Sequence, residues 1–200
     1  MIETLESKIL EEVPTDDSTS REEKMILHDE IKKLNPKVIV ESGTHRGLTT
    51  LYMLCAVADG HLHTADPYEW GARGNFRKFP ELEQKVTYYQ MPASQMIEHL
   101  EEKVDFAFID GFHEKIEVLK EMEKLLPKLA DGAVVYFHDT NGSNDYCDVV
   151  GAIAELGLTV DYLKTSNGMA KYVHNKGGDS GQVHDTEVKK RKARKTVRTK

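Results

Sequence analysis

Apolar and polar residues alternate along the chain in two different rhythms. Short runs rich in β-branched and aromatic residues, such as VIV at 38–40 and FAFI at 106–109, are typical of strands buried on both faces of a sheet. Longer stretches between them carry apolar residues at the spacing of a helix face. The strand-like runs lie at 38–41, 61–66, 85–90, 104–110, 133–139, 159–165 and 169–174. The helix-like stretches lie at 21–34, 48–58, 93–102, 114–129 and 148–157.

Strands that alternate with helices predict an α/β fold with a Rossmann-like, doubly wound and mostly parallel seven-stranded sheet. The last two strands are joined only by SNG at 166–168, which predicts an antiparallel C-terminal hairpin strand. The polar and aromatic stretch 68–84 is expected to be a long loop with one helical turn. We expect one domain over 21–174, between a flexible acidic N-terminal segment at 1–20 and a disordered tail at 175–200.

The net charge of −7 hides an uneven distribution of charged residues. The last twelve residues, KKRKARKTVRTK, contain eight Lys or Arg and no acid, whereas the rest of the chain is strongly acidic. A basic tail of this kind binds nucleic acid by releasing counterions. The same composition also suits a tail that only keeps the chain in solution. The tail is therefore a candidate nucleic-acid contact, and both interpretations stay open.

The chain is expected to be cytoplasmic and to have no membrane segment. No apolar run approaches the roughly 18–20 residues that a membrane-spanning helix needs. The first twenty residues are acidic and lack the basic and apolar regions of a secretory signal. Cys55 and Cys147 show no metal-type spacing, so we expect them to be reduced thiols.

Four of the predicted strands end in an acid: Glu41, Asp66, Asp110 and Asp139. Open α/β sheets bind ligands at the carboxyl ends of their strands, so these acids are expected at one binding edge. A single acid at such a place is equally well explained as a helix cap. The first acid opens the loop ESGTHRG, whose two glycines allow a tight turn and close approach of a ligand to the backbone.

Three motifs carry a family resemblance. They are ESGTHRG (Glu41 to Gly47), IDGFH (Ile109 to His113) and FHDT (Phe137 to Thr140). Their order over about residues 25–174 resembles the class I S-adenosylmethionine (SAM)-dependent methyltransferases. The narrower resemblance is to the small O-methyltransferase-like group of the methyltransferase family 24 type.

The resemblance implies a SAM cradle. The first loop would wrap the methionine part of the cofactor, with Glu41 held toward its amino group directly or through water. Asp66 would accept hydrogen bonds from the ribose hydroxyls, Ser94 with Ala93 would contact the adenine ring, and Asp110 would lie beside the sulfonium. His45 stands where many relatives have a middle glycine. The implied cofactor-binding residues are Glu41, Gly43, Thr44, Gly47, Asp66, Ser94 and Asp110.

The acids and histidines at two strand ends are the candidate catalytic residues, namely Asp110, His113 and His138. Carboxylates with an imidazole suit Mg²⁺ or Mn²⁺, so we expect a metal on Asp110, His138 and Asp139, where it would orient an acceptor hydroxyl and lower its pKa. His113 or His138 could instead be the general base. A third interpretation makes His138 a structural residue that hydrogen-bonds a backbone carbonyl.

The leading functional hypothesis is methylation of a hydroxyl on a small molecule, a sugar or an aromatic compound, by an enzyme that could form a homodimer. One alternative keeps the fold but gives it a hydroxylase or glycan-pathway role. Another is a nucleic-acid-associated protein docked by the basic tail. An NAD-dependent dehydrogenase is disfavoured because GTHRG lacks the G-x-G-x-x-G pattern. Methylation of a base amino group is disfavoured because no NPPY-type tetrapeptide follows the fourth strand.

Overall fold

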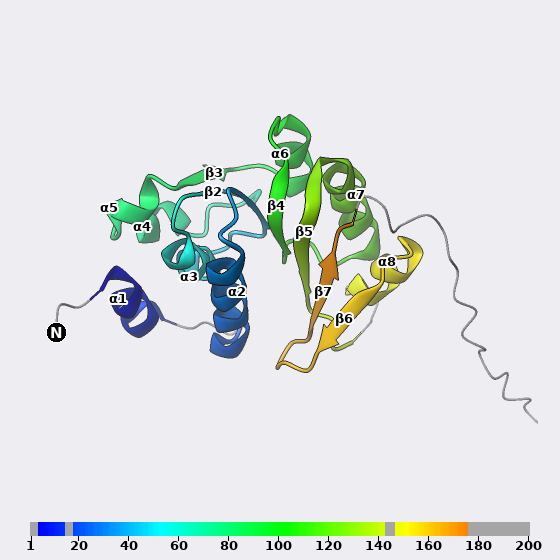
Figure 1. Ribbon diagram of the computed structural model, residues 1–200, viewed down its shortest axis with the longest axis horizontal. Coiled ribbons are helices and arrows are strands. Elements are labelled where there is room, and N and C mark those ends of the chain that lie inside the picture. The colour runs from blue at the N-terminus through cyan, green and yellow to red at the C-terminus, as the bar shows by residue number, and fades with distance from the viewer. Residues whose placement is uncertain (1–3, 15–17, 143–146, 176–200) are drawn as a thin grey trace, which may run out of the picture.

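A seven-stranded sheet runs through the centre of the computed structural model, which describes residues 4–14, 18–142 and 147–175 (Figure 1). The strand order is β3-β2-β1-β4-β5-β7-β6. The strands are β1 (Val38–Ser42), β2 (His61–Ala65), β3 (Val86–Tyr89), β4 (Val104–Ile109), β5 (Leu129–His138), β6 (Val160–Leu163) and β7 (Met169–Val173). Six of them match strand-like runs of the sequence closely, whereas β5 begins four residues before its run at 133–139.

The first five strands are parallel to one another, and β7 pairs antiparallel with both β5 and β6. The chain between β6 and β7 is too short for a crossover, so these two strands can only form a hairpin. The predicted Rossmann-like sheet with an antiparallel C-terminal strand is therefore confirmed. Its reversal of strand order beside β1 and β4 is the point at which α/β sheets bind ligands.

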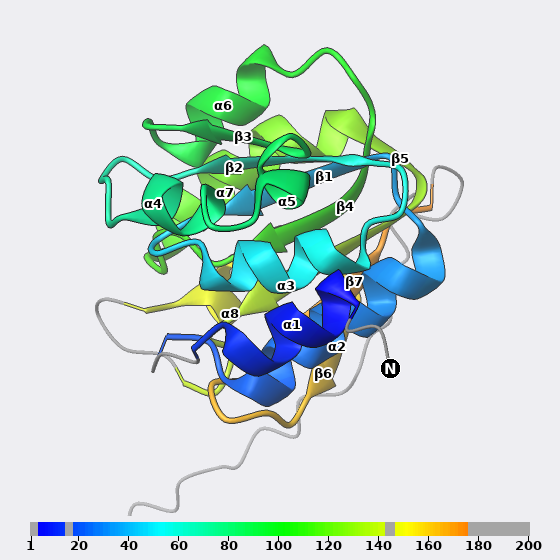
Figure 2. The same ribbon diagram turned by 90° about the vertical axis from the view of Figure 1, so that its left-hand side faces the viewer.

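Helices cover both faces of the sheet, and Figure 2 shows α3 and α6 on opposite sides of β1, β2 and β3. Alternate side chains of each strand point to opposite faces of the sheet and form two separate hydrophobic cores. Phe106 and Phe108 of β4 pack with α3 on one face, whereas Ala107 and Ile109 pack with α6 and α7 on the other. The principal helices are α2 (Arg21–Leu34), α3 (Leu48–Ala56), α6 (Ala93–His99), α7 (Lys115–Leu125) and α8 (Val149–Glu155).

The prediction for one connecting segment needs revision. The stretch 68–84 contains two short helices, α4 (Ala72–Phe76) and α5 (Pro80–Glu83), instead of one helical turn. Phe76 and Leu82 anchor these helices because both side chains are buried in the core under α3. Polar residues stand between these apolar residues, so the sequence pattern did not reveal the two helices. The 3₁₀ turn η1 (Leu126–Lys128) ends the helical stretch before β5.

The N-terminal segment is not wholly flexible, because it contains helix α1 (Leu5–Glu12). Thr4 caps this helix by accepting a hydrogen bond from the Ser7 N–H at 3.1 Å. Ile9 is 0 % exposed and joins the core beside α3. Val13 is buried in the same core, and Leu5 and Leu10 pack against it, but the many acids between these apolar residues hid the helix pattern in the sequence.

Several expectations fall on chain that the structure does not describe. The basic tail lies within 176–200 and outside the described residues, so its nucleic-acid contact stays a prediction. The expected homodimer and cytoplasmic location also stay predictions. Among the helices of the described chain, none has the length and apolar character required to cross a membrane.

Ile9→Ala is expected to lower the free energy of unfolding by about 2–4 kcal/mol, because it empties a fully buried site in the core. Urea unfolding of this variant would be compared with Glu11→Ala, which changes an exposed position of the same helix. Equal stability of the two variants would show that α1 is not docked on the domain.

Candidate active site at the carboxyl edge of the sheet

A cavity of about 550 Å³ opens at the carboxyl ends of β1, β2, β4 and β5. The predicted residues Gly43, Thr44, Asp66, Asp110 and His113 line it. Asp139 lines it as well. Four other predicted residues lie outside its lining, namely Glu41, Gly47, Ser94 and His138. The structure therefore brings most, but not all, of the predicted site together.

The glycine loop is shaped by close contact between β1 and β4. Gly43 has φ +88°, and a Cβ atom there would lie 2.1 Å from the carbonyl oxygen of Asp110. Only glycine fits this position, because any side chain would meet backbone. Gly47 has φ +73° and caps α3, and a Cβ there would lie 2.5 Å from the ring of Phe76. The loop backbone is thus held against both the sheet and α4.

His45, in the middle of the loop, also takes a left-handed conformation with φ +45°. Its N–H donates to Asp66 Oδ2 at 2.9 Å, and the N–H of Tyr68 donates to Asp66 Oδ1 at 2.9 Å. The Asp66 carboxylate therefore ties the loop after β1 to the loop after β2. Each of its oxygens keeps a lone pair for a ligand hydroxyl.

Glu41 is fully buried behind the loop. Its Oε2 accepts hydrogen bonds from the hydroxyls of Thr50 and Thr64, each at 2.6 Å, and its Oε1 has no hydrogen-bond partner among the described residues. Burial raises the pKa of Glu41 to about 8 despite these hydrogen bonds, and the charges of Asp110 and Asp66 add to the shift. Glu41 is therefore protonated near neutral pH.

The start of α6 borders the cavity. Ala93 lines it, whereas Ser94 is half-buried and lies outside the lining. The adenine contact expected of these two residues stays a prediction. At the cavity mouth, Tyr68 and Trp70 are 62 % and 54 % exposed, and their ring centroids lie 5.9 Å apart.

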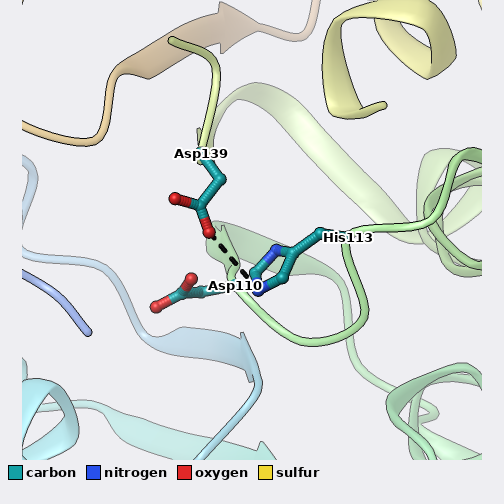
Figure 3. Close-up of side chains that lie close together, drawn as sticks. All are labelled: Asp110, His113 and Asp139. Carbon is teal, nitrogen blue, oxygen red and sulfur yellow. Dashed lines mark ion pairs between the residues drawn. The ribbon is translucent and has the colours of Figure 1, made fainter. Parts of the chain in front are cut away.

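Asp110, His113 and Asp139 form a compact group with the ligand atoms of all three within 4.8 Å of one another (Figure 3). His113 Nε2 lies 3.3 Å from Asp139 Oδ2, and the hydroxyl of Thr19 donates to Asp110 Oδ2 at 3.1 Å. Asp139 takes φ +56°, which is rare outside glycine and turns its side chain at the end of β5. Two carboxylates and an imidazole suit a divalent cation such as Mg²⁺ or Mn²⁺.

His138 stands outside this group and is 0 % exposed. Its Nδ1 lies 2.8 Å from Asp110 Oδ1 and 3.5 Å from Asp139 Oδ2, and its Nε2 lies 3.3 Å from Glu23 Oε2. These are charge contacts whose angles miss hydrogen-bond geometry. Burial alone would lower the pKa of His138, but the carboxylates of Asp110, Asp139 and Glu23 outweigh it and raise the pKa to about 12. The ring is thus a buried cation.

Glu23 is a site residue that the sequence analysis missed. It completes the capping box of α2 by accepting from the Ser20 N–H at 2.8 Å, and its other oxygen accepts from Thr165 Oγ1 at 2.7 Å and the Asn167 N–H at 2.9 Å. Burial opposes ionisation, yet contacts with His138 and these donors hold the pKa of Glu23 well below its ordinary value. The S-x-x-E pattern at 20–23 signals a cap, but not a contact with β5.

Glu121 of α7 is a second carboxylate that the sequence analysis did not single out. It lines the cavity and is 3 % exposed. Ser42 Oγ donates to its Oε1 at 2.9 Å, while its Oε2 has no hydrogen-bond partner among the described residues. Burial raises the pKa of Glu121 to about 7. Its place on the inner face of an amphipathic helix gave no signal distinct from the charged residues around it.

A comparison with known protein families gives one match that covers both the glycine loop and the strand ends of the site. The sequence profile of a family described as "Methyltransferase domain" matches residues 40–140, from β1 to the end of β5. The protein belongs to this methyltransferase family. The resemblance drawn from the three motifs is therefore confirmed for the methyltransferase domain, since all three lie within or at the edges of the matched region.

Solved structures of similar fold include several O-methyltransferases. A protein from Klebsiella pneumoniae provisionally described as an O-methyltransferase has a TM-score of 0.71 and 22 % identity, with 84 % of this chain and 90 % of that chain covered. The O-methyltransferase from Bacillus cereus, in complex with S-adenosylhomocysteine (SAH), has a TM-score of 0.68 and 23 % identity, with 84 % and 91 % covered. These likenesses establish the class I methyltransferase fold.

Two further proteins are similar to this chain. The O-methyltransferase TomG from Streptomyces achromogenes, involved in tomaymycin synthesis and in complex with SAM, has a TM-score of 0.66 and 17 % identity, with 85 % and 87 % covered. An uncharacterized protein from Sinorhizobium fredii is 30 % identical over 125 residues, or 55 % of this chain. The chain spans only 14 % of the length of that curated relative.

Glu41→Gln is expected to stabilise the methyltransferase domain at alkaline pH. The folded state keeps the carboxyl of Glu41 protonated to about pH 8, whereas the unfolded chain ionises it from about pH 4.5. The free energy of unfolding of the wild type therefore falls as pH rises across this interval, by roughly 5 kcal/mol from this group alone, and Gln removes that loss. Urea unfolding across the interval measures the difference, with exposed Glu81→Gln as control. A difference that does not change with pH would contradict the buried, protonated state.

Glu23→Gln is expected to lower the free energy of unfolding by about 3 kcal/mol, because it leaves the buried cation of His138 short of one carboxylate. Glu22→Gln, at the exposed preceding position, is the control and should change stability by less than about 0.5 kcal/mol. Chemical unfolding near neutral pH provides the measurement. Matching stabilities of the two variants would mean that His138 carries no charge in the folded state.

Proposed function

We propose that this methyltransferase domain transfers the methyl group of SAM to a hydroxyl group of a small molecule. The observation that carries the proposal is one cavity in which a glycine cradle adjoins the half-buried group of Asp110, His113 and Asp139. The family match supports methyl transfer, and the fold of the solved O-methyltransferases supports a hydroxyl acceptor. The curated relative adds no substrate.

The residues of the cavity fit SAM. Gly43 lines the cavity and carries no side chain, so a ligand can approach the backbone of the turn closely. Asp66 projects acceptor oxygens toward the cavity at the end of β2, where it would take the ribose hydroxyls. Ala93 leaves a small apolar surface that suits the adenine ring. Gly47, although outside the lining, would hold the loop in its binding shape.

When bound, SAM would supply an electrophilic methyl group, and SAH would leave as the acceptor oxygen bonds to that methyl carbon in line with the breaking C–S bond. The domain must therefore hold donor and acceptor in one alignment, and such positioning is worth about 7–11 kcal/mol in well-oriented systems. The contact between Gly43 and Asp110 fixes the end of β1 against the end of β4. The loop that holds the donor and the acid beside the acceptor are thereby set in a fixed relation.

The acid and histidine group would prepare the acceptor hydroxyl. A Mg²⁺ or Mn²⁺ held by Asp110, His113 and Asp139 would lower the pKa of that hydroxyl. His113 is half-exposed and lines the cavity, so it can also accept the proton directly. His138 would act neither as ligand nor as base, because both of its nitrogens face carboxylates. It would instead hold Asp110 and Asp139 in place.

The exposed rings at the mouth suit a planar or ring-shaped acceptor. Trp70 lies edge-on to His45, with ring centroids 5.5 Å apart, and Tyr68 lies edge-on to Trp70. Phe112 is also exposed at the rim. Aromatic faces of this kind stack on aromatic rings and on the apolar faces of sugars. An aromatic or sugar hydroxyl is therefore the proposed acceptor class.

The deciding experiment titrates SAH into the protein by calorimetry and then measures methyl transfer to a panel of catechols, phenols and sugars. Asp66→Ala is expected to weaken SAH binding at least about 10-fold, because hydrogen bonds to a charged carboxylate are lost. Asp59→Ala, which removes an exposed acid paired with Lys37, should bind like the wild type. Turnover should fall when divalent ions are chelated, while SAH affinity stays the same.

The outcomes separate the parts of this proposal. Absence of SAH binding to the wild type would overturn the assignment to methyl transfer. SAH binding without methyl transfer to any of these catechols, phenols and sugars would overturn the proposed acceptor class. Turnover that is unchanged after chelation would leave His113 as the base and remove the metal.

A further inference from the structure

At the corner formed by the carboxyl ends of β1 and β4, one buried polar atom has no hydrogen-bond partner among the described residues. Glu121 reaches this corner from α7, with Oε1 held by the hydroxyl of Ser42 at 2.9 Å. Its Oε2 is buried and has no hydrogen-bond partner among the described residues. A buried carboxylate oxygen without a donor costs free energy, so its presence on a cavity wall points to a donor supplied by a ligand.

The geometry limits which part of a ligand reaches Glu121. Ser42, Gly43 and Gly111 line the same cavity, and Glu121 Oε1 lies 3.5 Å from the place of a Cβ on Gly111. This corner is at β4, one strand beyond β1, whereas Asp66 ends β2 on the other side of β1. A ligand whose ribose lies at Asp66 and whose chain crosses the glycine turn therefore brings its far end to Glu121.

The far end of SAM is an amino acid, and its amino group is a cation with N–H donors only. A carboxylate beside a glycine turn matches this group in charge and in hydrogen bonding. Glu41, the acid suggested by the motif, does not line the cavity. It is fully buried outside the lining, and its Oε2 is already occupied by Thr50 and Thr64.

We propose that Glu121, positioned by Ser42, binds the amino group of the methionine part of SAM. The inference rests on the proposed function, because it takes SAM as the ligand of the cavity. Glu121 is then a cofactor-binding residue that lies outside the three motifs, on the helix after β4. It makes the cavity selective for ligands that carry an ammonium group at this end.

The test compares SAH with its deamino analogue, in which hydrogen replaces the amino group. Calorimetry would measure the binding of both ligands to wild type, Glu121→Gln and Glu123→Gln. Glu123 is exposed on the opposite side of the same helix, so its variant matches the change in charge without touching the cavity. Glu121→Gln should bind SAH about 10- to 100-fold more weakly and bind the deamino analogue like the wild type. Glu123→Gln should bind both ligands normally.

Three results would overturn the inference while leaving the proposed function intact. They are unchanged SAH affinity in Glu121→Gln, an equal loss for both ligands, and a wild type that does not distinguish SAH from the deamino analogue. A wild type that binds neither ligand would instead overturn the proposed function itself. Should Glu121→Gln unfold, Ser42→Ala provides the second variant, with a smaller loss confined to SAH expected and an equal loss for both ligands as the contrary result.

Discussion

A buried positive charge on His138 governs how the carboxyl edge of this sheet is assembled. A cation without solvent is tolerated only beside compensating carboxylates. These come from three separate elements: Asp110 after β4, Asp139 after β5 and Glu23 in α2. The charge therefore joins helix α2 to the two strand ends that carry the candidate chemistry. It also holds Asp110 and Asp139 near each other, where their mutual repulsion would otherwise separate them.

The carboxyl groups around the cavity play different roles because their surroundings differ. Glu41 is buried and protonated, so it stabilises the base of the loop without adding charge to the cavity. Asp66 lies at the lining and ties two loops through backbone N–H groups. Asp139 is half-buried, and burial is outweighed by the charges of His138 and His113, which hold the pKa of Asp139 below its ordinary value. The same functional group thus serves as packing, tether or candidate ligand according to its surroundings.

The arrangement suits a reaction that depends on alignment more than on a single reactive side chain. The glycine turn and the carboxylate of Asp110 come from adjacent parallel strands, whose relative position is fixed by their hydrogen-bond register. The N-terminal segment adds Thr19, and the β6–β7 connection adds Asn167, so elements from both ends of the domain border the cavity. This construction places the site on strands and helices, with the exposed aromatic residues Tyr68 and Trp70 on the loop after β2.

The sequence by itself determined the strands, their acids and the glycine turn, because these are local properties of apolar runs, strand ends and backbone conformation. The order of motifs was enough to predict the fold and the family. Only the tertiary structure decided which acids face the cavity, because that depends on packing between helices and strands far apart in the chain. It turned His138 toward Glu23, more than a hundred positions earlier, and placed Glu121 under Ser42 instead of leaving it on the solvent face of α7. No periodicity within one element encodes such contacts, since each requires two elements already docked on the same sheet.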